Sequence, residues 1–157
     1  MVTWGELHSS RADLADAGRQ LLYQFGVGLA FLATVGRGGA PRVHPFCPLL
    51  TEVDLFAFLV PSPKRDDLLR NGAYATHSFP CRDNEDAFYL AGRAKQVGDD
   101  AVRSELEQQF LDERRQFGLS PDDLADQLLF RFDIDRCLLT RTTGHGDPQP
   151  QHTIWRG

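Results

Sequence analysis

The sequence predicts an antiparallel β-barrel with helices at its periphery, formed by a single domain over residues 1–157. The chain has 157 residues, of which 41% are hydrophobic and 25% charged, and this fits one globular domain with a core of ordinary size. Strand-like segments follow one another through short turns between residues 29 and 60. Parallel neighbours need connections of a dozen or more residues, so these strands must be antiparallel. Closure into a small barrel would remove their exposed edges.

The first half of the chain begins with an expected helix over about residues 10–25. Ser10 is placed to cap this helix, and its apolar residues recur at steps of three and four. The barrel is expected from about residue 29 to 157. Its first three strands are predicted at 29–35, 42–50 and 53–60, with a glycine-rich turn at 36–39.

The second half alternates short helices with further strands. Ser62 and Pro63 open a helix that stops at Gly72. Asp99 caps a longer helix, and Ser120 precedes another helix start. The remaining strands are predicted at residues 73–79, 87–97, 127–140 and 152–155, with a loop at 144–150.

Composition and charge exclude several classes of function. The formal net charge of −5 disfavours nonspecific binding to nucleic acid, which needs a basic surface. No apolar run approaches the roughly 18–20 residues of a membrane span, and the N-terminal residues do not resemble a signal peptide. Cys47, Cys81 and Cys137 are far apart and odd in number, which favours free thiols over a disulfide framework or a metal site. The sequence therefore predicts a cytoplasmic protein with no metal, no membrane and no nucleic-acid partner.

The start of the short helix is the segment that points most directly to chemistry. With Ser62 as N-cap, Pro63 is the first helical residue and Lys64 and Arg65 are the second and third. Two cations in a first turn are unfavourable, because the helix dipole places positive partial charge there, and each costs about 0.3–1 kcal/mol. An anion bound at this helix end would make the interaction favourable. Free backbone N–H groups, a hydroxyl and two cations suit a phosphate. The alternative is that the two aspartates that follow neutralise the pair and nothing binds.

A second candidate lies on the second strand, where Arg42 and His44 share one face and Val43 points to the other. Pro45 has no N–H, so strand pairing must lapse there, at an edge or a bulge. An unpaired backbone beside a basic face can offer hydrogen bonds to a planar ligand. The alternative is a solvated arginine and an ordinary surface histidine.

These features in this order resemble the pyridoxamine 5′-phosphate oxidase-like, FMN-binding split-barrel family over nearly the whole chain. The residues that carry the resemblance are Leu32-Ala33-Thr34-Val35, Gly39-Ala40-Pro41-Arg42-Val43-His44-Pro45, Ser62-Pro63-Lys64-Arg65-Asp66-Asp67-Leu68, Ala75-Thr76-His77-Ser78 and Trp155-Arg156. The resemblance implies a six-stranded antiparallel split barrel that forms a homodimer, with FMN sites at the subunit interface.

The resemblance also implies where FMN would lie. The second strand, with Arg42, Val43, His44 and Pro45, would follow the flavin ring and ribityl chain. Ser62, Lys64 and Arg65 would reach the phosphate. His77 and Ser78 could reach the flavin, either within one chain or from the partner subunit. Trp155 resembles a C-terminal tryptophan that closes the site.

The function that the resemblance implies is that of a flavin-dependent oxidoreductase acting on an unidentified small molecule, with no catalytic acid or base assigned. The C-terminal segment around His145 does not reproduce the oxidase's substrate-binding pattern, so pyridoxamine phosphate is not the expected substrate. Two alternatives stay open. One is a deazaflavin-dependent reductase, and the other is a non-catalytic flavin- or haem-binding protein with an axial histidine from among His44, His77, His145 and His152.

Overall fold

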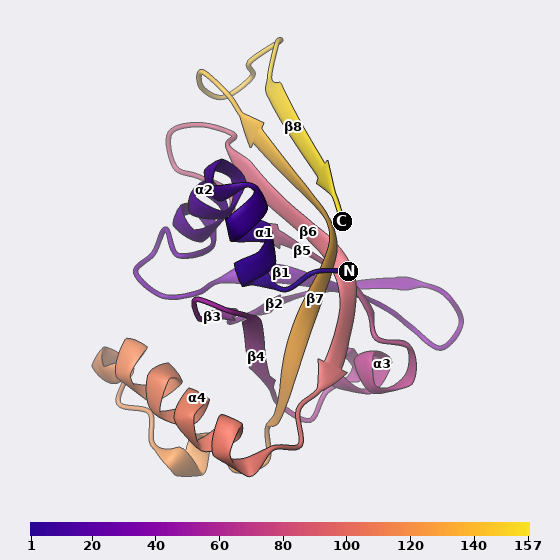
Figure 1. Ribbon diagram of the computed structural model, residues 1–157, viewed down its shortest axis with the longest axis vertical. Helices are drawn as coiled ribbons and strands as arrows, with labels where there is room; N and C mark the ends of the chain where they lie inside the picture. The colour runs from indigo at the N-terminus through magenta and orange to yellow at the C-terminus, as the bar shows by residue number, and fades with distance from the viewer.

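A computed structural model describes all 157 residues and shows one antiparallel sheet that curls into a half-barrel, with helices at its periphery (Figure 1). The predicted mainly β fold is confirmed. The sheet contains eight strands, in the order β2-β1-β5-β6-β7-β4-β3, with β8 paired to β7. The strands are β1 (Ala30–Val35), β2 (Pro41–Phe46), β3 (Leu49–Leu50), β4 (Leu55–Leu59), β5 (Ala73–Ser78), β6 (Ala87–Gln96), β7 (Leu128–Arg141) and β8 (Gln151–Arg156).

The expected strand at 42–50 is divided in two, which is one reason why the sheet has eight strands and not six. β2 ends at Phe46, and β3 begins at Leu49 and pairs with β4. Pro48 lies in the break, where it has no N–H to donate to a neighbouring strand. β2 and β3 consequently occupy the two ends of the strand order, so the sheet is open between them.

The 14-residue strand β7 joins the two halves of the sheet. Its first part pairs with β4 and its last part with β8, while β6 runs along most of its length. The β6–β7 register shifts between Ala91 and Gly92. A Cβ on Gly92 would stand 2.0 Å from the carbonyl oxygen of Asp133, so only glycine permits this approach.

The N-terminal segment forms two helices, and the expectation of one helix over residues 10–25 was wrong in its bounds. α1 is Trp4–Ser10 and α2 is Ala12–Leu22. Ser10 is the last residue of α1 and caps nothing. The helical segment begins earlier because Thr3 and Glu6 form a reciprocal capping box, and it breaks at Arg11, which has φ of −145°.

The long connection between β6 and β7 contains α4 (Asp100–Glu113) and two 3₁₀ turns, Arg115–Phe117 and Pro121–Leu124. As predicted, Asp99 caps α4, through bonds from the N–H groups of Ala101 and Val102. This connection covers the end of the sheet at β3 and β4 (Figure 1), and the end of α4 approaches the end of α2, where the hydroxyl of Tyr23 donates to Glu113 at 3.3 Å. Its Leu106, Phe110 and Leu124 join a small second core with residues of β3, β4 and β7.

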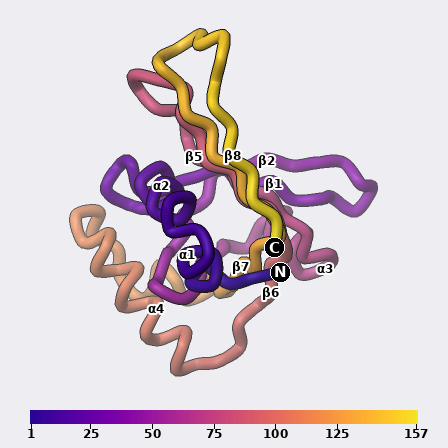
Figure 2. Tube along the Cα trace, turned by 45° about the horizontal axis from the view of Figure 1, so that its top comes forward, coloured from indigo at the N-terminus to yellow at the C-terminus, as the bar shows by residue number.

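The main core lies between the inner face of the sheet and helices α1 and α2. It contains 24 buried residues, with Trp4 against Phe88 at its centre. The two chain termini lie side by side, as both Figure 1 and Figure 2 show, because Met1 and Gly157 both contact Asp135. No helix has both the length and the apolar character needed to cross a bilayer.

Candidate functional site

The predicted short helix is present as α3 (Pro63–Asn71), with Pro63 in its first turn and Gly72 ending it at φ of 72°. Ser62 has the extended backbone of an N-cap, but its hydroxyl donates to the carbonyl oxygen of Val60, at 2.9 Å, and does not cap the helix. The N–H groups of the first turn therefore have no side-chain acceptor, and they are free to bind an anion.

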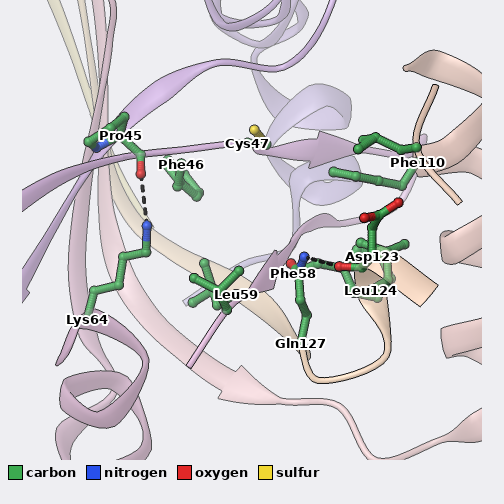
Figure 3. A pocket seen from close by; sticks show the side chains of 12 residues that line it. Pro45, Phe46, Cys47, Phe58, Leu59, Lys64, Phe110, Asp123, Leu124 and Gln127 are labelled. Atoms are coloured by element: carbon green, nitrogen blue, oxygen red, sulfur yellow. Dashed lines mark hydrogen bonds between the residues drawn. The ribbon is translucent and has the colours of Figure 1, made fainter. Parts of the chain in front are cut away.

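The two cations of this first turn have backbone carbonyls as their hydrogen-bond acceptors. Lys64 donates from Nζ to the carbonyl oxygen of Pro45 at 2.9 Å (Figure 3), and Arg65 donates from Nη1 to the carbonyl oxygen of Asp126 at 2.9 Å. Neither forms an ion pair with a carboxylate. Nε of Arg65 is buried without a hydrogen-bond partner. Burial lowers the pKa of Lys64, and the nearby Cys47 opposes that shift. Both cations would gain from an acidic ligand.

Asp67 does not neutralise Lys64 or Arg65, as the alternative interpretation of the sequence would require. Asp67 is 3% exposed and forms ion pairs with Arg42, at 2.9 Å from Nε, and Arg70, at 3.1 Å. The hydroxyl of Thr34 donates to the same carboxylate at 2.9 Å. Asp67 thereby fixes α3 to β1 and β2 and leaves the charges of Lys64 and Arg65 uncompensated.

These contacts make the stability of the protein depend on pH through Asp67. Burial by itself would raise the pKa of Asp67, but hydrogen bonds from Thr34 and Arg70 and the charge of Arg42 outweigh burial and hold this pKa below its usual value. Asp67 therefore stabilises the fold fully above the unfolded-state pKa of about 3.9, and this contribution is lost as the pH falls through the lower folded-state pKa.

We expect Asp67→Asn to lower the free energy of unfolding by about 1–3 kcal/mol at pH 7, because a buried charge-assisted network is broken. The deficit relative to the parent protein should begin to shrink below about pH 4, and should be lost as the pH falls through the lower folded-state pKa, where the folded parent also loses this charge. Urea unfolding of both proteins at pH 7, 5 and 3 measures this difference in the free energy of unfolding. Asp66→Asn is the matched control, since Asp66 is exposed and forms no ion pair, and an equal loss in both variants would contradict the assignment.

The predicted residues of the second strand lie on β2, at the edge of the sheet, and are divided between its two faces. β2 is an edge strand, as was predicted for Pro45, but the expected lapse in pairing there was wrong, because the pairing with β1 continues through Pro45 to Phe46. Arg42 and His44 stand opposite Thr34 and Leu32 of β1, whose side chains are buried on the inner face. Val43 and Pro45 point to the other face. The basic side chains of β2 therefore share the side of the sheet on which α3 packs.

His77, Ser78 and Trp155 occupy other parts of the sheet within one chain. Pro45, Phe31 and His77 form one cross-strand row on the outer face. Ser78 is fully buried, and its hydroxyl accepts from the N–H of Phe88 at 3.0 Å. Trp155 packs against the main core, and β7, β6, β5 and β1 stand between its strand and β2. Within a single chain the structure brings together only the residues of β2 and α3.

An apolar pocket of about 230 Å³ adjoins Lys64, and sequence reasoning missed it (Figure 3). One wall comes from Cys47, directly after β2, from Phe58 on β4 and from Lys64 at the start of α3. The other wall comes from the β6–β7 connection, with Phe110 and Leu124. Val102, Leu106 and Phe110 recur at four-residue steps, which indicates one buried face of α4. Nothing local in the sequence indicates what that face packs against.

A second, polar hollow of about 190 Å³ lies on the other side of the helix start. Arg37, Arg42 and Arg70 line it together with Pro63 and the two aspartates of α3. Of its three arginines, Arg37 is exposed and forms no ion pair. Arg42 and Arg70 already pair with Asp67, so Arg37 is the unpaired cation of this hollow beside the helix start.

Comparison with solved structures places this fold among split-barrel proteins. The chain resembles a Clostridium acetobutylicum protein related to general stress protein 26, of the pyridoxinephosphate oxidase family, with TM-score 0.63, 12% identity and coverage of 97% of this chain and 95% of that one. It also resembles the haem storage protein of Vibrio cholerae, with TM-score 0.63, 16% identity and coverage of 91% and 94%. A haem-binding protein of Mycobacterium smegmatis gives TM-score 0.62 and 15% identity over 87% of this chain, which spans only 57% of that protein.

No family model and no curated protein sequence matches the chain. The structural neighbours therefore define the fold class, a split barrel of the kind found in pyridoxamine 5′-phosphate oxidase-like and haem-binding proteins.

Proposed function

We propose that this protein binds FMN and is a flavin-dependent oxidoreductase for a small molecule. The observation that carries the proposal is the uncapped start of α3, where Lys64 and Arg65 have no carboxylate partner and Nε of Arg65 is buried and unbonded. A phosphate would accept from the first-turn N–H groups and from both side chains. The split-barrel neighbours, which include a protein of the pyridoxinephosphate oxidase family, support the same proposal.

In this proposal the flavin supplies the hydride chemistry, and the chain binds and orients it. Arg42 and His44 would lie beside the ribityl chain on the inner side of β2, and Ser62 would border the phosphate. Arg42 is held by Asp67 before any ligand arrives, so little side-chain ordering would accompany binding. No residue of the chain is assigned as a proton donor or acceptor.

The site would be completed in a homodimer. His77 and Trp155 lie away from α3 within one chain, so their proposed contact with the flavin requires the partner subunit. Ser78 is fully buried, so its proposed contact would also require a change in the sheet. We expect light scattering at micromolar concentration to give about twice the chain mass of 17.6 kDa. A mass near 17.6 kDa would contradict the shared site.

Mass spectrometry of the cofactor released from denatured protein tests the proposal most directly. Released FMN, with flavin absorption bands in the native protein, is the expected result. A colourless protein that binds only a deazaflavin coenzyme would overturn FMN in favour of the reductase alternative.

Haem is the second candidate, because two haem-binding proteins are among the structural neighbours. Titration with haemin would then give a Soret shift. Four single variants would identify the axial ligand, because only replacement of the ligating histidine by alanine would abolish the Soret shift. The histidines to replace are His44, His77, His145 and His152. A protein that releases FMN and gives no Soret shift excludes this candidate.

A further inference from the structure

The pocket beside Lys64 has the composition of a binding site for a small amphipathic molecule. Its floor and sides come from aromatic and aliphatic side chains, among them Phe46, Phe58, Phe110 and Leu124. Polar groups stand mainly at its two ends, with Lys64 at one and Asp123 with Gln127 at the other (Figure 3). The volume of about 230 Å³ falls below the roughly 300–1,000 Å³ of pockets for drug-sized ligands. It gives room for roughly eight water-sized groups at about 30 Å³ each, which is too little for a flavin ring system with its side chain.

Charge decides which end of the pocket would attract a ligand's polar group. The ammonium of Lys64 has three N–H donors, and Pro45 accepts one of them, so two remain available. Partial burial of the ammonium lowers the pKa of Lys64, and the nearby Cys47 opposes that shift. At the other end, the carboxylate of Asp123 already accepts from the N–H and hydroxyl of Ser120, at 2.8 and 3.0 Å, and Gln127 donates to the backbone of Asp123. Gln127 keeps one unused amide N–H, but only the lysine end combines unused donors with a positive charge.

We propose that this pocket binds a small monocarboxylate with an apolar body of about eight carbons. Its carboxylate accepts from Lys64, and its tail lies against the apolar surface formed by Phe58, Phe110 and Leu124. The rings of Phe58 and Phe110 contact each other edge-to-face, with centroids 5.6 Å apart, and so form one continuous wall. Leu119, which is 38% exposed, stands at the pocket wall where the connection meets solvent. The inference does not require the flavin, because it uses only the cavity, its apolar lining and Lys64. Lys64 is shared with the proposed phosphate site, and of its two unused N–H donors one would serve the phosphate and the other the carboxylate.

Calorimetric titration of the full chain with three ligands of the same length tests both the charge and the tail. Octanoate is expected to bind more tightly than octan-1-ol, and octylammonium more weakly than either. Lys64→Met should weaken octanoate binding by at least about tenfold, the loss expected for a charge-assisted hydrogen bond, and leave octan-1-ol unchanged. Lys64→Arg should retain most of the preference for octanoate.

Two further variants separate the pocket from other surfaces. Leu119→Trp should fill the space beside the connection and weaken octanoate and octan-1-ol alike. Lys95→Met removes the only other lysine, which pairs with Asp133 on the sheet, and should leave octanoate binding unchanged. Absence of saturable octanoate binding, or equal octanoate affinity in the parent and Lys64→Met proteins, would overturn the inference. Neither result bears on the proposed function, which is tested separately by the identity of the released cofactor.

Discussion

Replacing Lys64 and Arg65 together by alanine is expected to raise the dissociation constant for FMN by one to three orders of magnitude. Each charge-assisted hydrogen bond to a phosphate contributes about 1.5–3 kcal/mol, and tenfold in affinity corresponds to about 1.4 kcal/mol. The two contributions need not add, because both side chains would contact one group. Quenching of flavin fluorescence during titration measures the effect.

Riboflavin provides the matched ligand for this experiment because it lacks the phosphate. The double variant should bind riboflavin as tightly as the parent protein does, so the preference for FMN over riboflavin should disappear. Arg82→Ala with Arg115→Ala, which removes two highly exposed charges elsewhere, should leave both affinities unchanged. Unchanged FMN affinity in the Lys64 and Arg65 double variant would refute the phosphate site.

The largest expected effect on stability comes from Phe88, where the N-terminal helices meet the sheet. Phe88 is fully buried on β6 and packs edge-to-face on Trp4, with ring centroids 6.3 Å apart. A Cβ on Gly18 of α2 would stand 2.4 Å from the Phe88 ring, so the helix lies directly on this side chain. Phe88→Ala would remove the ring from between α1, α2 and β6 and leave a cavity.

We expect Phe88→Ala to lower the free energy of unfolding by about 3–5 kcal/mol, the range for deletion of a buried aromatic ring. Chemical denaturation followed by circular dichroism measures the change. Phe117→Ala is the matched control, since Phe117 is 60% exposed in a 3₁₀ turn and its loss should cost well under 1 kcal/mol. If Phe88→Ala also lowered the free energy of unfolding by well under 1 kcal/mol, the contact between the N-terminal helices and the sheet would contribute little to stability.

Local sequence rules predicted the parts of the fold that depend on a few consecutive residues. The helix from Pro63 to Asn71 follows from an N-cap serine, a proline in the first turn and a glycine that ends it in the left-handed region. The hairpin between β1 and β2 follows from glycines that permit a tight turn, and Gly39 has φ of 85°. The position of Pro45 on an edge strand follows from its missing N–H.

The same rules failed to place the bounds of two elements, because a neighbouring residue fixed each bound. Ser10 is an acceptable cap by composition, but the capping box of Thr3 and Glu6 begins the helical segment seven residues earlier. The strand predicted at residues 42–50 was wrong in its extent, because strand-like composition does not show that Pro48 interrupts the strand pairing. Both errors concern the bounds of elements and leave the fold class unchanged.

The sequence by itself determined a mainly β chain with a cationic, proline-initiated helix start, because capping, periodicity and turn chemistry act within a few residues. The tertiary structure alone decided the partner of each charge. Asp67 lies beside Lys64 and Arg65 in sequence, yet it pairs with Arg42 on a strand 25 residues earlier and with Arg70 one turn later. The apolar pocket likewise exists only because a connection far along the chain folds back onto β2 and β4. Ion pairs and cavities depend on which segments the sheet brings together, and that information is not local to any segment of the sequence.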